Sequence, residues 1–574
     1  MLKINSQAQL KLIENGVEFR IDPIKIRLYS KNDSRCIKIR NGCIFIYEWI
    51  EYRVKISPEN LFEDARVYFG DEEAEKDEHF WRYTFKNYIG TSKFRVYHND
   101  KLLLENDLEV ISSKFAYLGD KEDIDNYIDF VETIKEELIR YSLELPFDIR
   151  APTEFQIEES LEPISPLFAY HFFKKNRERI ISAYEQILSM PYKRLEEQGE
   201  WVNLTEATTV DEDLIIGIIS KPEFLRACNY PLSKKIGGFV PEKVHQWKKY
   251  ESLDTPENRF VKYFLKKLDF WLEEVLKWIK QMDHKISCKD LIDLQSYIEM
   301  VLNNPILSDI GDLNIFPSQS QVLLKREGYQ DILELWRQFN AYAPTFNEIC
   351  DAIANKRVDI LYEYWCLFEL IKKLKVILGG LENIIVPCNF GRIKEEIIIA
   401  NFKRNYKLVY NRKFYRINNR DEKLVGSYSV PLKPDYTLLK DEEIIAVFDA
   451  KFRFEDKFAR LSIKDLEKEE EHARKTGNIE LLAKLSDIFK MHTYKDALKA
   501  NIAVILYPGN ANRFFTIDGK CIEDFPENIL RQILNDESLR GIGFLSFIPS
   551  KKVRRWYNWN IGCFKDLDFT GHGV

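Results

Sequence analysis

Two acidic residues and a lysine lie within one short stretch of the chain, at a spacing that could bring them into one reactive site. Residues 433–453 read KPDYTLLKDEEIIAVFDAKFR. The apolar run IIAVF predicts a buried strand, yet it leads directly into Asp449 and Lys451, which share one face because they lie two residues apart. If the segment folds as a hairpin with its turn at residues 440–443, Asp435 lies across from the neighbourhood of Phe448 and Asp449, and two carboxylates and an ammonium converge.

This group of charges suits a divalent metal ion. Two carboxylates held close together repel each other unless a cation lies between them, and carboxylate oxygens suit Mg²⁺ or Mn²⁺. A bound metal polarises a phosphoryl oxygen and activates water, while a neighbouring lysine orients that water or stabilises charge on phosphorus. The spacing therefore favours metal-dependent phosphodiester hydrolysis, with Asp435 and Asp449 as metal ligands and Lys451 as a catalytic group. The alternative is a turn aspartate at position 435 and a simple ion pair between Asp449 and Lys451 at a sheet edge.

The elements that must position these residues fall into three expected parts of a multidomain α+β protein. Residues 1–120 contain short alternating segments such as VEFRI, IKIRLYS and CIFIYEW, which predict a β-rich module. Residues 121–350 are expected to be mainly helical, with helices near 166–190, 256–282 and 328–340, the second of them capped by Thr255. Residues 351–574 mix helical and strand patterns, which predicts an α/β domain.

Composition limits the classes of function. The chain has 574 residues, of which 45% are hydrophobic and 13% aromatic, so a folded protein is expected. Its formal net charge of −7 means that any contact with nucleic acid must be regional. Nine cysteines without a Cys-x-x-Cys pair favour reduced thiols over a disulfide framework or a zinc site. Because the sequence lacks a signal-peptide core and a run of roughly 18 apolar residues, a cytoplasmic protein without a membrane span is expected.

The hairpin sequence resembles a known family. PDYTLLKDEEIIAVFDAKF is similar to the core of the PD-(D/E)XK nuclease superfamily, with Asp435, Asp449 and Lys451 on signature positions. The resemblance implies that residues 351–574 form a restriction-endonuclease-like domain that uses Mg²⁺, or Mn²⁺ in its place. It also implies a catalytic glutamate on a helix ahead of the hairpin. In RVDILYEYWCLFEL, Glu363 fits this position best and Glu369 second best.

A second resemblance lies downstream of the hairpin. SDIFKMHTYKDAL followed by AVILYPG resembles McrC-like restriction nucleases, whose helix often carries Gln-x-x-x-Tyr. Tyr494 matches the tyrosine, but Lys490 stands at the glutamine position, so the resemblance assigns no role to Lys490. Tyr494 and His492 are expected to line the site, with helix packing as the alternative for Tyr494 and a structural role as the alternative for His492. The segment DTPENRFVKYFL resembles an uncharacterised domain that precedes this type of nuclease.

Together the resemblances imply a DNA endonuclease subunit of a McrBC-like restriction or phage-defence system. Relatives act with an AAA+ GTPase or ATPase, and this chain has no G-x-x-x-x-G-K-[ST] phosphate loop, so the motor is expected to be a separate subunit. One alternative is a non-cleaving scaffold or adaptor that docks on an AAA+ NTPase and stimulates it. Another is a nuclease that acts on RNA or on branched DNA, because the metal site reads only the phosphodiester.

Two basic and aromatic clusters are candidate DNA contacts. Basic side chains beside aromatic rings suit phosphate binding, although each cluster alone is also typical of a solvated surface. The first cluster, beside Trp556 and Tyr557, consists of Lys551, Lys552, Arg554 and Arg555. The second, beside Tyr415, consists of Arg412, Lys413 and Arg416. The sequence shows neither a helix-turn-helix nor a zinc finger, so base-specific recognition is not assigned.

Overall fold

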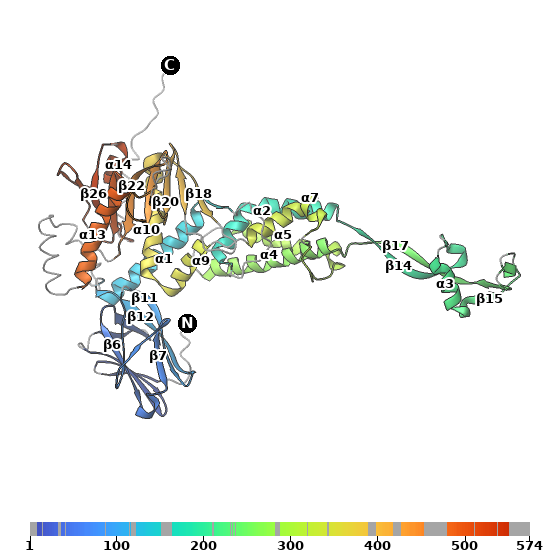
Figure 1. The fold of residues 1–574 in the computed structure, drawn as a ribbon, viewed down its shortest axis with the longest axis horizontal. Helices are drawn as coiled ribbons and strands as arrows, with labels where there is room; N and C mark the ends of the chain where they lie inside the picture. Colours follow the sequence, from blue (N-terminus) through green and yellow to red (C-terminus); the bar gives the residue numbers. More distant parts are fainter. Residues whose placement is uncertain are drawn as a thin grey trace, which may run out of the picture. The chain divides into compact units, whose positions relative to one another are not determined.

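The computed structural model divides the chain into two compact units (Figure 1). The first comprises Met1–Glu154, Glu162–Phe168 and Tyr342–Val574, and the second comprises Phe155–Leu161 and Ala169–Ala341. The structure describes residues 9–549, apart from single positions and from residues 32–35, 116–121, 151–163, 282–287, 341–343, 388–397, 417–425 and 453–478. No helix among these described residues is long and apolar enough to cross a membrane.

The first unit begins with a β module of two packed sheets. In one sheet the described strands have the order β1 (Gln9–Ile13), β2 (Gly16–Ile21), β3 (Ile24–Ser30), β6 (Glu51–Ser57), β10 (Trp81–Thr84) and β9 (Glu75–Lys76). The other has the order β4 (Ile37–Arg40), β5 (Cys43–Tyr47), β12 (Lys101–Ile111), β11 (Gly90–His98), β7 (Ala65–Phe69) and β8 (Glu72–Glu73). Alternate residues of β6 are buried, which places Tyr52, Val54 and Ile56 in the core. A short 3₁₀ turn, η1 (Glu59–Leu61), follows β6.

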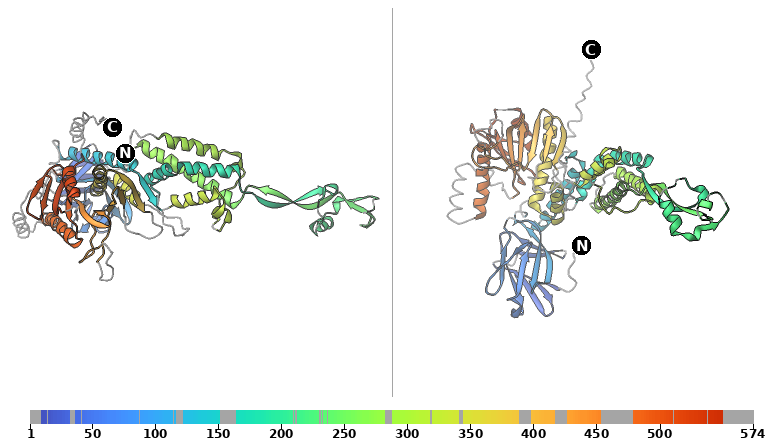
Figure 2. Two further views of the ribbon diagram at one scale, coloured as in Figure 1. Left: turned by 90° about the horizontal axis from the view of Figure 1, so that it is seen from above. Right: turned by 45° about the vertical axis from the view of Figure 1, so that its right-hand side comes forward.

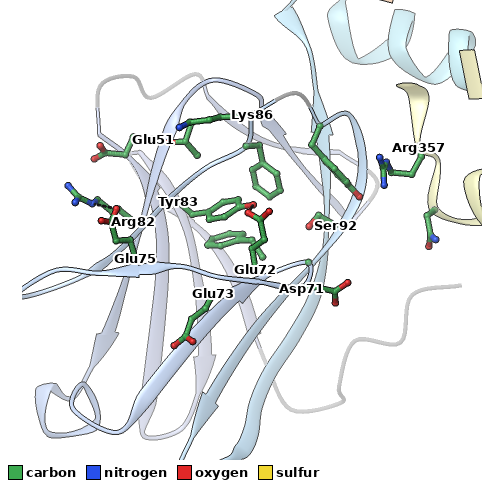
Figure 3. A pocket seen from close by; sticks show the side chains of 16 residues that line it. Glu51, Asp71, Glu72, Glu73, Glu75, Arg82, Tyr83, Lys86, Ser92 and Arg357 are labelled. Carbon is green, nitrogen blue, oxygen red and sulfur yellow. Dashed lines mark hydrogen bonds and ion pairs between the residues drawn. The ribbon is translucent and has the colours of Figure 1, made fainter. Parts of the chain in front are cut away.

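A cavity of about 890 Å³ opens at one end of this module (Figure 3). The rings of Phe69 and Tyr83 stack in its wall with their centroids 4.7 Å apart. Tyr83 donates a hydrogen bond to Glu72 at 2.7 Å, one of several carboxylates around the cavity. Arg357, from the C-terminal part of the same unit, also lines it.

The C-terminal part of the first unit is built on one large sheet. The described strands run in the order β13 (Phe147–Arg150), β18 (Leu381–Pro387), β19 (Ile399–Phe402), β20 (Tyr406–Tyr410), β21 (Tyr436–Lys440), β22 (Glu443–Ala450), β23 (Ile502–Tyr507), β26 (Gly541–Ser546), β24 (Arg513–Thr516) and β25 (Cys521–Glu523). Strands β22, β23 and β26 are parallel neighbours. Every residue of β23 is buried, as expected for a parallel strand covered on both faces.

Helices cover the two faces of this sheet. Met491 and Tyr494 of α13 (Ile479–Ala497) pack against Val447 and Ile505 on one face. The long helix α10 (Val358–Leu378) lies against the other face, where the Tyr436 hydroxyl donates to the main-chain oxygen of Glu363 at 2.7 Å. Among the described residues, the same unit also contains α1 (Asp123–Glu144), α9 (Pro344–Asn355) and α14 (Pro526–Asn535).

Residues 121–150 belong to the first unit, whereas the sequence analysis assigned them to the helical middle part. Helix α1 packs on α10, with the indole of Trp365 donating to Glu137 at 2.7 Å and the hydroxyl of Tyr141 donating to Glu369 at 2.7 Å. Strand β13 then pairs in parallel with β18. The compact units therefore divide the chain differently from the three expected parts, because the β module, α1 and the C-terminal sheet cluster together.

The second unit contains the predicted helical region. Its helices include most of α2 (Pro166–Ser189), α4 (Pro256–Gln281), α5 (Lys289–Leu302), α6 (Pro305–Ser308), α7 (Gln321–Lys325) and α8 (Tyr329–Phe339). The predicted cap of α4 is present, because the Thr255 hydroxyl oxygen accepts the N–H of Asn258 at 3.2 Å.

A β ribbon that the sequence did not predict extends from these helices (Figure 2). It consists of β14 (Arg194–Asn203) paired with β17 (Lys243–Ser252), and the connection between them carries α3 (Glu212–Ser220), β15 (Leu225–Ala227) and β16 (Phe239–Pro241). The described residues of the same connection also form short 3₁₀ turns: η3 (Leu204–Glu206), η4 (Pro222–Phe224) and η5 (Ser233–Lys235). Residues of β14 are exposed on both faces over most of its length, so it lacks the alternation that marks a half-buried strand.

Candidate functional site

The hairpin of β21 and β22 brings the two predicted metal ligands to one place. Tyr436 pairs with Phe448, so the same register sets Asp435 opposite Asp449. The turn lies where the sequence predicts it, with Asp441 and Glu442 in the left-handed region that a tight two-residue hairpin needs. Asp435 Oδ2 accepts the N–H of Ala450 at 2.8 Å, which ties the ends of the two strands together.

Asp449 lies at the centre of the group and is fully buried, with 0% of its surface exposed. The ammonium of Lys451 lies 2.5 Å from its Oδ2, and that of Lys490, on α13, lies 3.6 Å from its Oδ1. Neither carboxylate oxygen accepts a hydrogen bond of ordinary geometry from a described residue. Buried polar atoms are nearly always satisfied, so these oxygens, which the described lysines contact as ion pairs, suit a bound cation.

Glu363 approaches from the opposite side of the sheet. Helix α10 carries it, and the Tyr410 hydroxyl donates to its Oε1 at 2.8 Å. Two other predicted catalytic residues influence its pKa: the charge of Lys451 lowers it and that of Asp449 raises it. The structure thus brings together all four residues that the sequence analysis selected as catalytic.

The electrostatics of the site favour a bound cation. Burial raises the pKa of Asp435 well above its ordinary range, and the Asp449 carboxylate raises it further. Burial also raises the pKa of Glu363, against the hydrogen bond from Tyr410 and the charge of Lys451. Burial alone would lower the pKa of Lys451, but Asp449 and Asp435 outweigh it and hold that pKa above its ordinary value. Carboxylates crowded in this way are stabilised by positive charge between them.

The donor set fits a small divalent ion bound partly by solvent. Mg²⁺ is commonly held by one or two carboxylates, with water and phosphate oxygens completing its shell. Asp435 and Asp449 provide two carboxylates on facing strands. Within the described part of the chain, no three His, Cys, Asp or Glu side chains gather closely enough to hold a metal ion by themselves. Among the described residues, an ion here would have these two carboxylates, and water and phosphate oxygens suit the rest of its shell.

The two residues predicted to line the site have different surroundings. Tyr494 is buried among core residues, and its hydroxyl donates to the main-chain oxygen of Lys433 at 2.9 Å. Burial and then the charges of Asp449 and Asp435 raise the pKa of Tyr494, so it both packs the helix and borders the site.

His492 is exposed, and the expectation that it lines the site is corrected. The charged groups that act on it are those of Asp496 and Lys495. The reason is helical geometry: positions 490 and 494 share one face of α13, whereas position 492 lies on another. Glu369, the second choice for the catalytic glutamate, instead lies 3.3 Å from the ammonium of Lys373 and contacts Tyr141.

The candidate DNA contacts are only partly described. Lys551, Lys552, Arg554 and Arg555 lie outside the described residues. The second cluster follows β20 and begins beside the site, because the N–H of Asn411 donates to the main-chain oxygen of Asp435 at 2.8 Å. In this cluster, Arg412 lies 5.2 Å from the ring centroid of Phe414, and Lys413 lies 5.0 Å from that of Tyr415.

Two neighbours of the catalytic group were missed from the sequence. The approach of Lys490 to Asp449 could have been inferred from its spacing of four residues from Tyr494, which sets both on one helical face. Tyr410 had no comparable signal, because its role depends on how β20 lies against α10.

Family models match two parts of the chain. Residues 360–512 match the model of the PD-(D/E)XK nuclease superfamily, and residues 82–336 match that of a domain of unknown function, DUF2357. The search of curated proteins found no match. Among solved structures, the chain is similar to one described as a refined half-complex from a tetradecameric assembly of Thermococcus gammatolerans McrB AAA+ hexamers with bound McrC, at 13% identity, 85% coverage of each chain and a TM-score of 0.23. The C-terminal domain of this chain, which holds all four predicted catalytic residues, belongs to the PD-(D/E)XK nuclease superfamily.

Proposed function

We propose that this chain is a metal-dependent DNA endonuclease, with Mg²⁺ or Mn²⁺ as its cofactor, and that it serves as the nuclease subunit of a McrBC-like restriction or phage-defence system. The observation that supports this most is the buried Asp449 carboxylate. It lies opposite Asp435, carries the Lys451 ammonium 2.5 Å from one oxygen, and accepts no hydrogen bond of ordinary geometry from a described residue.

Each residue of the site has a separate role in the proposed hydrolysis. A divalent ion on Asp435 and Asp449 would supply Lewis acidity toward the scissile phosphoryl group and an activated water. The Ala450 N–H fixes the carboxylate of Asp435, so that ligand is oriented before substrate arrives. Lys451, kept protonated by the two aspartates, orients the attacking water or stabilises negative charge on phosphorus. Glu363, held by Tyr410, completes the acidic side of the site.

DNA is the proposed substrate, and the basic cluster at residues 412–416 is a described candidate for contact with its backbone. This cluster borders the site through Asn411, and it combines cationic side chains with the exposed ring of Tyr415. Such a surface suits a phosphate backbone. Because the metal site contacts only the phosphodiester group, RNA and branched DNA should be tested as substrates in the same assay as duplex DNA.

A separate AAA+ NTPase is the proposed protein partner. The chain carries no phosphate loop of its own. In the second unit, helix α3 exposes Ile215, Ile216 and Ile219 by 53%, 57% and 75%. Contiguous exposed apolar side chains commonly mark a protein contact, and we assign this one to the motor. Aspartate at Ile216 and Ile219 should therefore abolish co-purification with the motor without affecting the metal site.

Site variants test the catalytic assignment. The full chain is incubated with duplex DNA, Mg²⁺ and each nucleoside triphosphate, with and without the motor. Asp449→Ala and Lys451→Ala should abolish cleavage while circular dichroism shows a folded protein. Glu443→Ala is the matched control, because it removes an exposed carboxylate from the same strand and should leave cleavage intact. Full cleavage by the Asp449→Ala protein would remove the assignment.

The same assay separates the nuclease from an adaptor. A wild-type chain that cuts no nucleic acid, yet stimulates the motor's NTPase equally well when Asp435, Asp449 and Lys451 are all replaced, would be a scaffold. A nuclease instead loses product formation with these substitutions, whatever happens to NTPase stimulation.

A further inference from the structure

Lys490 places a second ammonium at the proposed metal ligand. It comes from α13 rather than from the strand that carries Lys451, and its Nζ lies 3.6 Å from Asp449 Oδ1. The two lysines differ in access to solvent, since the side chain of Lys451 is 21% exposed and that of Lys490 is 42% exposed. Lys490 therefore reaches Asp449 from the open side of the site.

Neighbouring contacts hold Lys490 in this place. Its Nζ lies 5.1 Å from the ring centroid of Tyr494, one helical turn later, at a distance typical of a cation–π contact. Tyr494 is itself anchored, because its hydroxyl donates to the main-chain oxygen of Lys433, two residues before Asp435. The helix thus presents its ammonium to the hairpin in a defined position.

We propose that Lys490 is a substrate-binding residue that exchanges partners: it neutralises Asp449 while no divalent ion is bound, and it binds a phosphate oxygen of the substrate once an ion occupies the aspartates. This inference rests on the proposed nuclease function. An ion at Asp449 and the Lys490 ammonium compete for the same oxygen and repel each other. The long, partly exposed lysine stem allows the ammonium to move outward, where a phosphodiester supplies the negative charge that it has lost.

Lys451 is not equivalent in this respect. It lies closer to Asp449, it is more enclosed, and it also lies 3.4 Å from the main-chain oxygen of Ala450. Displacing it would leave a mostly buried cation without its partner. Lys490 is therefore the lysine that moves away from Asp449 when an ion binds.

Metal binding without DNA tests the first half of the exchange. Mn²⁺ binding to the full chain is measured by electron paramagnetic resonance for the wild type, Lys490→Gln and Lys490→Arg. Lys495→Gln is the matched control, because Lys495 lies on the same helix and pairs with Asp496 at 3.1 Å. We expect Lys490→Gln to bind Mn²⁺ several-fold more tightly, while the arginine and control variants bind like the wild type. Equal or weaker binding by Lys490→Gln would overturn the inference.

Cleavage kinetics test the second half. Lys490→Gln should raise the KM for DNA on the order of tenfold, with a smaller effect on kcat, and should lower the salt dependence of DNA binding because one phosphate contact is lost. Lys490→Arg should restore the KM. A normal KM in Lys490→Gln, or no rescue by arginine, would refute phosphate binding.

These outcomes also distinguish the inference from the proposed function. A chain that binds Mn²⁺ through Asp449 but cuts nothing disproves the nuclease, while the Mn²⁺ affinities still decide whether Lys490 competes for the ion. If the wild type binds no Mn²⁺, both the metal site and the exchange are refuted.

Discussion

Removing one hydroxyl should change the pH dependence of cleavage. The hydroxyl of Tyr410 donates to Glu363 Oε1 at 2.8 Å. Burial raises the pKa of Glu363, and this hydrogen bond is the strongest influence that lowers it. Tyr410→Phe keeps the ring and removes the donor, so the pKa of Glu363 should rise further.

The size of the effect follows from the energy of the lost bond. A hydrogen bond to a charged group contributes about 1.5–3 kcal/mol, and one pH unit corresponds to about 1.4 kcal/mol. If ionised Glu363 is needed, activity falls as pH drops through its pKa, so a higher pKa moves this loss to higher pH. The acid limb of the rate profile should therefore shift upward by about 1–2 pH units. Asp435 titrates in the same group, so the limb describes the coupled carboxyls together.

The assay is the single-turnover rate of DNA cleavage at saturating Mg²⁺, measured from acidic to mildly basic pH. Tyr436→Phe is a close control. Its ring stacks near that of Tyr410 with centroids 5.9 Å apart, but its hydroxyl donates to the main-chain oxygen of Glu363 rather than to the carboxylate. An acid limb in Tyr410→Phe that overlays the wild type, or an equal shift in both variants, would refute the reasoning.

Two further predictions concern stability. The pKa of Asp435 is higher in the folded than in the unfolded chain, so its ionisation opposes folding at neutral pH and costs nothing below the unfolded pKa. In EDTA at neutral pH, Asp435→Asn should therefore raise the free energy of unfolding by about 1 kcal/mol, and with it the melting temperature. The gain should vanish in acid, and calorimetry that shows a lower melting temperature at neutral pH would contradict this. Lys356→Met removes the ammonium from Glu109, whose side chain is 7% exposed and also accepts from Thr91 and Tyr127. Because Lys356 is itself 38% exposed, the loss in denaturant unfolding should be about 1–3 kcal/mol, below the 3–5 kcal/mol of a fully buried pair, and an unchanged midpoint would contradict it.

The hairpin could be predicted from sequence because the residues that determine it lie next to one another in the chain. The polar turn between two apolar runs brings Asp435 to the neighbourhood of Phe448 and Asp449. A bulge between Leu438 and Leu439, which the sequence does not reveal, then shifts the register by one residue and sets Asp435 opposite Asp449. Glu363 could be chosen only through family resemblance, since the contact with Tyr410 joins elements that are distant in sequence.

The failures have equally specific causes. His492 was placed at the site by its closeness to Tyr494 in sequence, although a helix separates positions two residues apart. Strand β13 pairs with β18 more than two hundred residues later, a partnership that no local pattern encodes. Strand β14 of the ribbon is exposed on both faces over most of its length, so it lacks the apolar alternation that identifies a strand.

The β module supports the catalytic site from two sides. Gly90 has a φ of +143°, and a Cβ there would lie 2.5 Å from the main-chain oxygen of Lys356, so only glycine permits this approach. Next to it, the Ile89 carbonyl accepts the N–H of Val358 at 3.1 Å, which satisfies one of the unpaired donors at the start of α10. That residue lies five positions before Glu363.

The second support reaches the end of the catalytic strand. The rings of Phe115 and Phe130 lie 5.6 and 5.3 Å from that of Phe452, the residue that follows Lys451. Both the helix of Glu363 and the strand end of Lys451 are thus positioned by residues before 131. A fragment beginning at residue 351 would retain every catalytic side chain and lose the contacts that align them. The cavity of the β module is lined in part by Arg357, the residue that immediately precedes α10, the helix that carries Glu363.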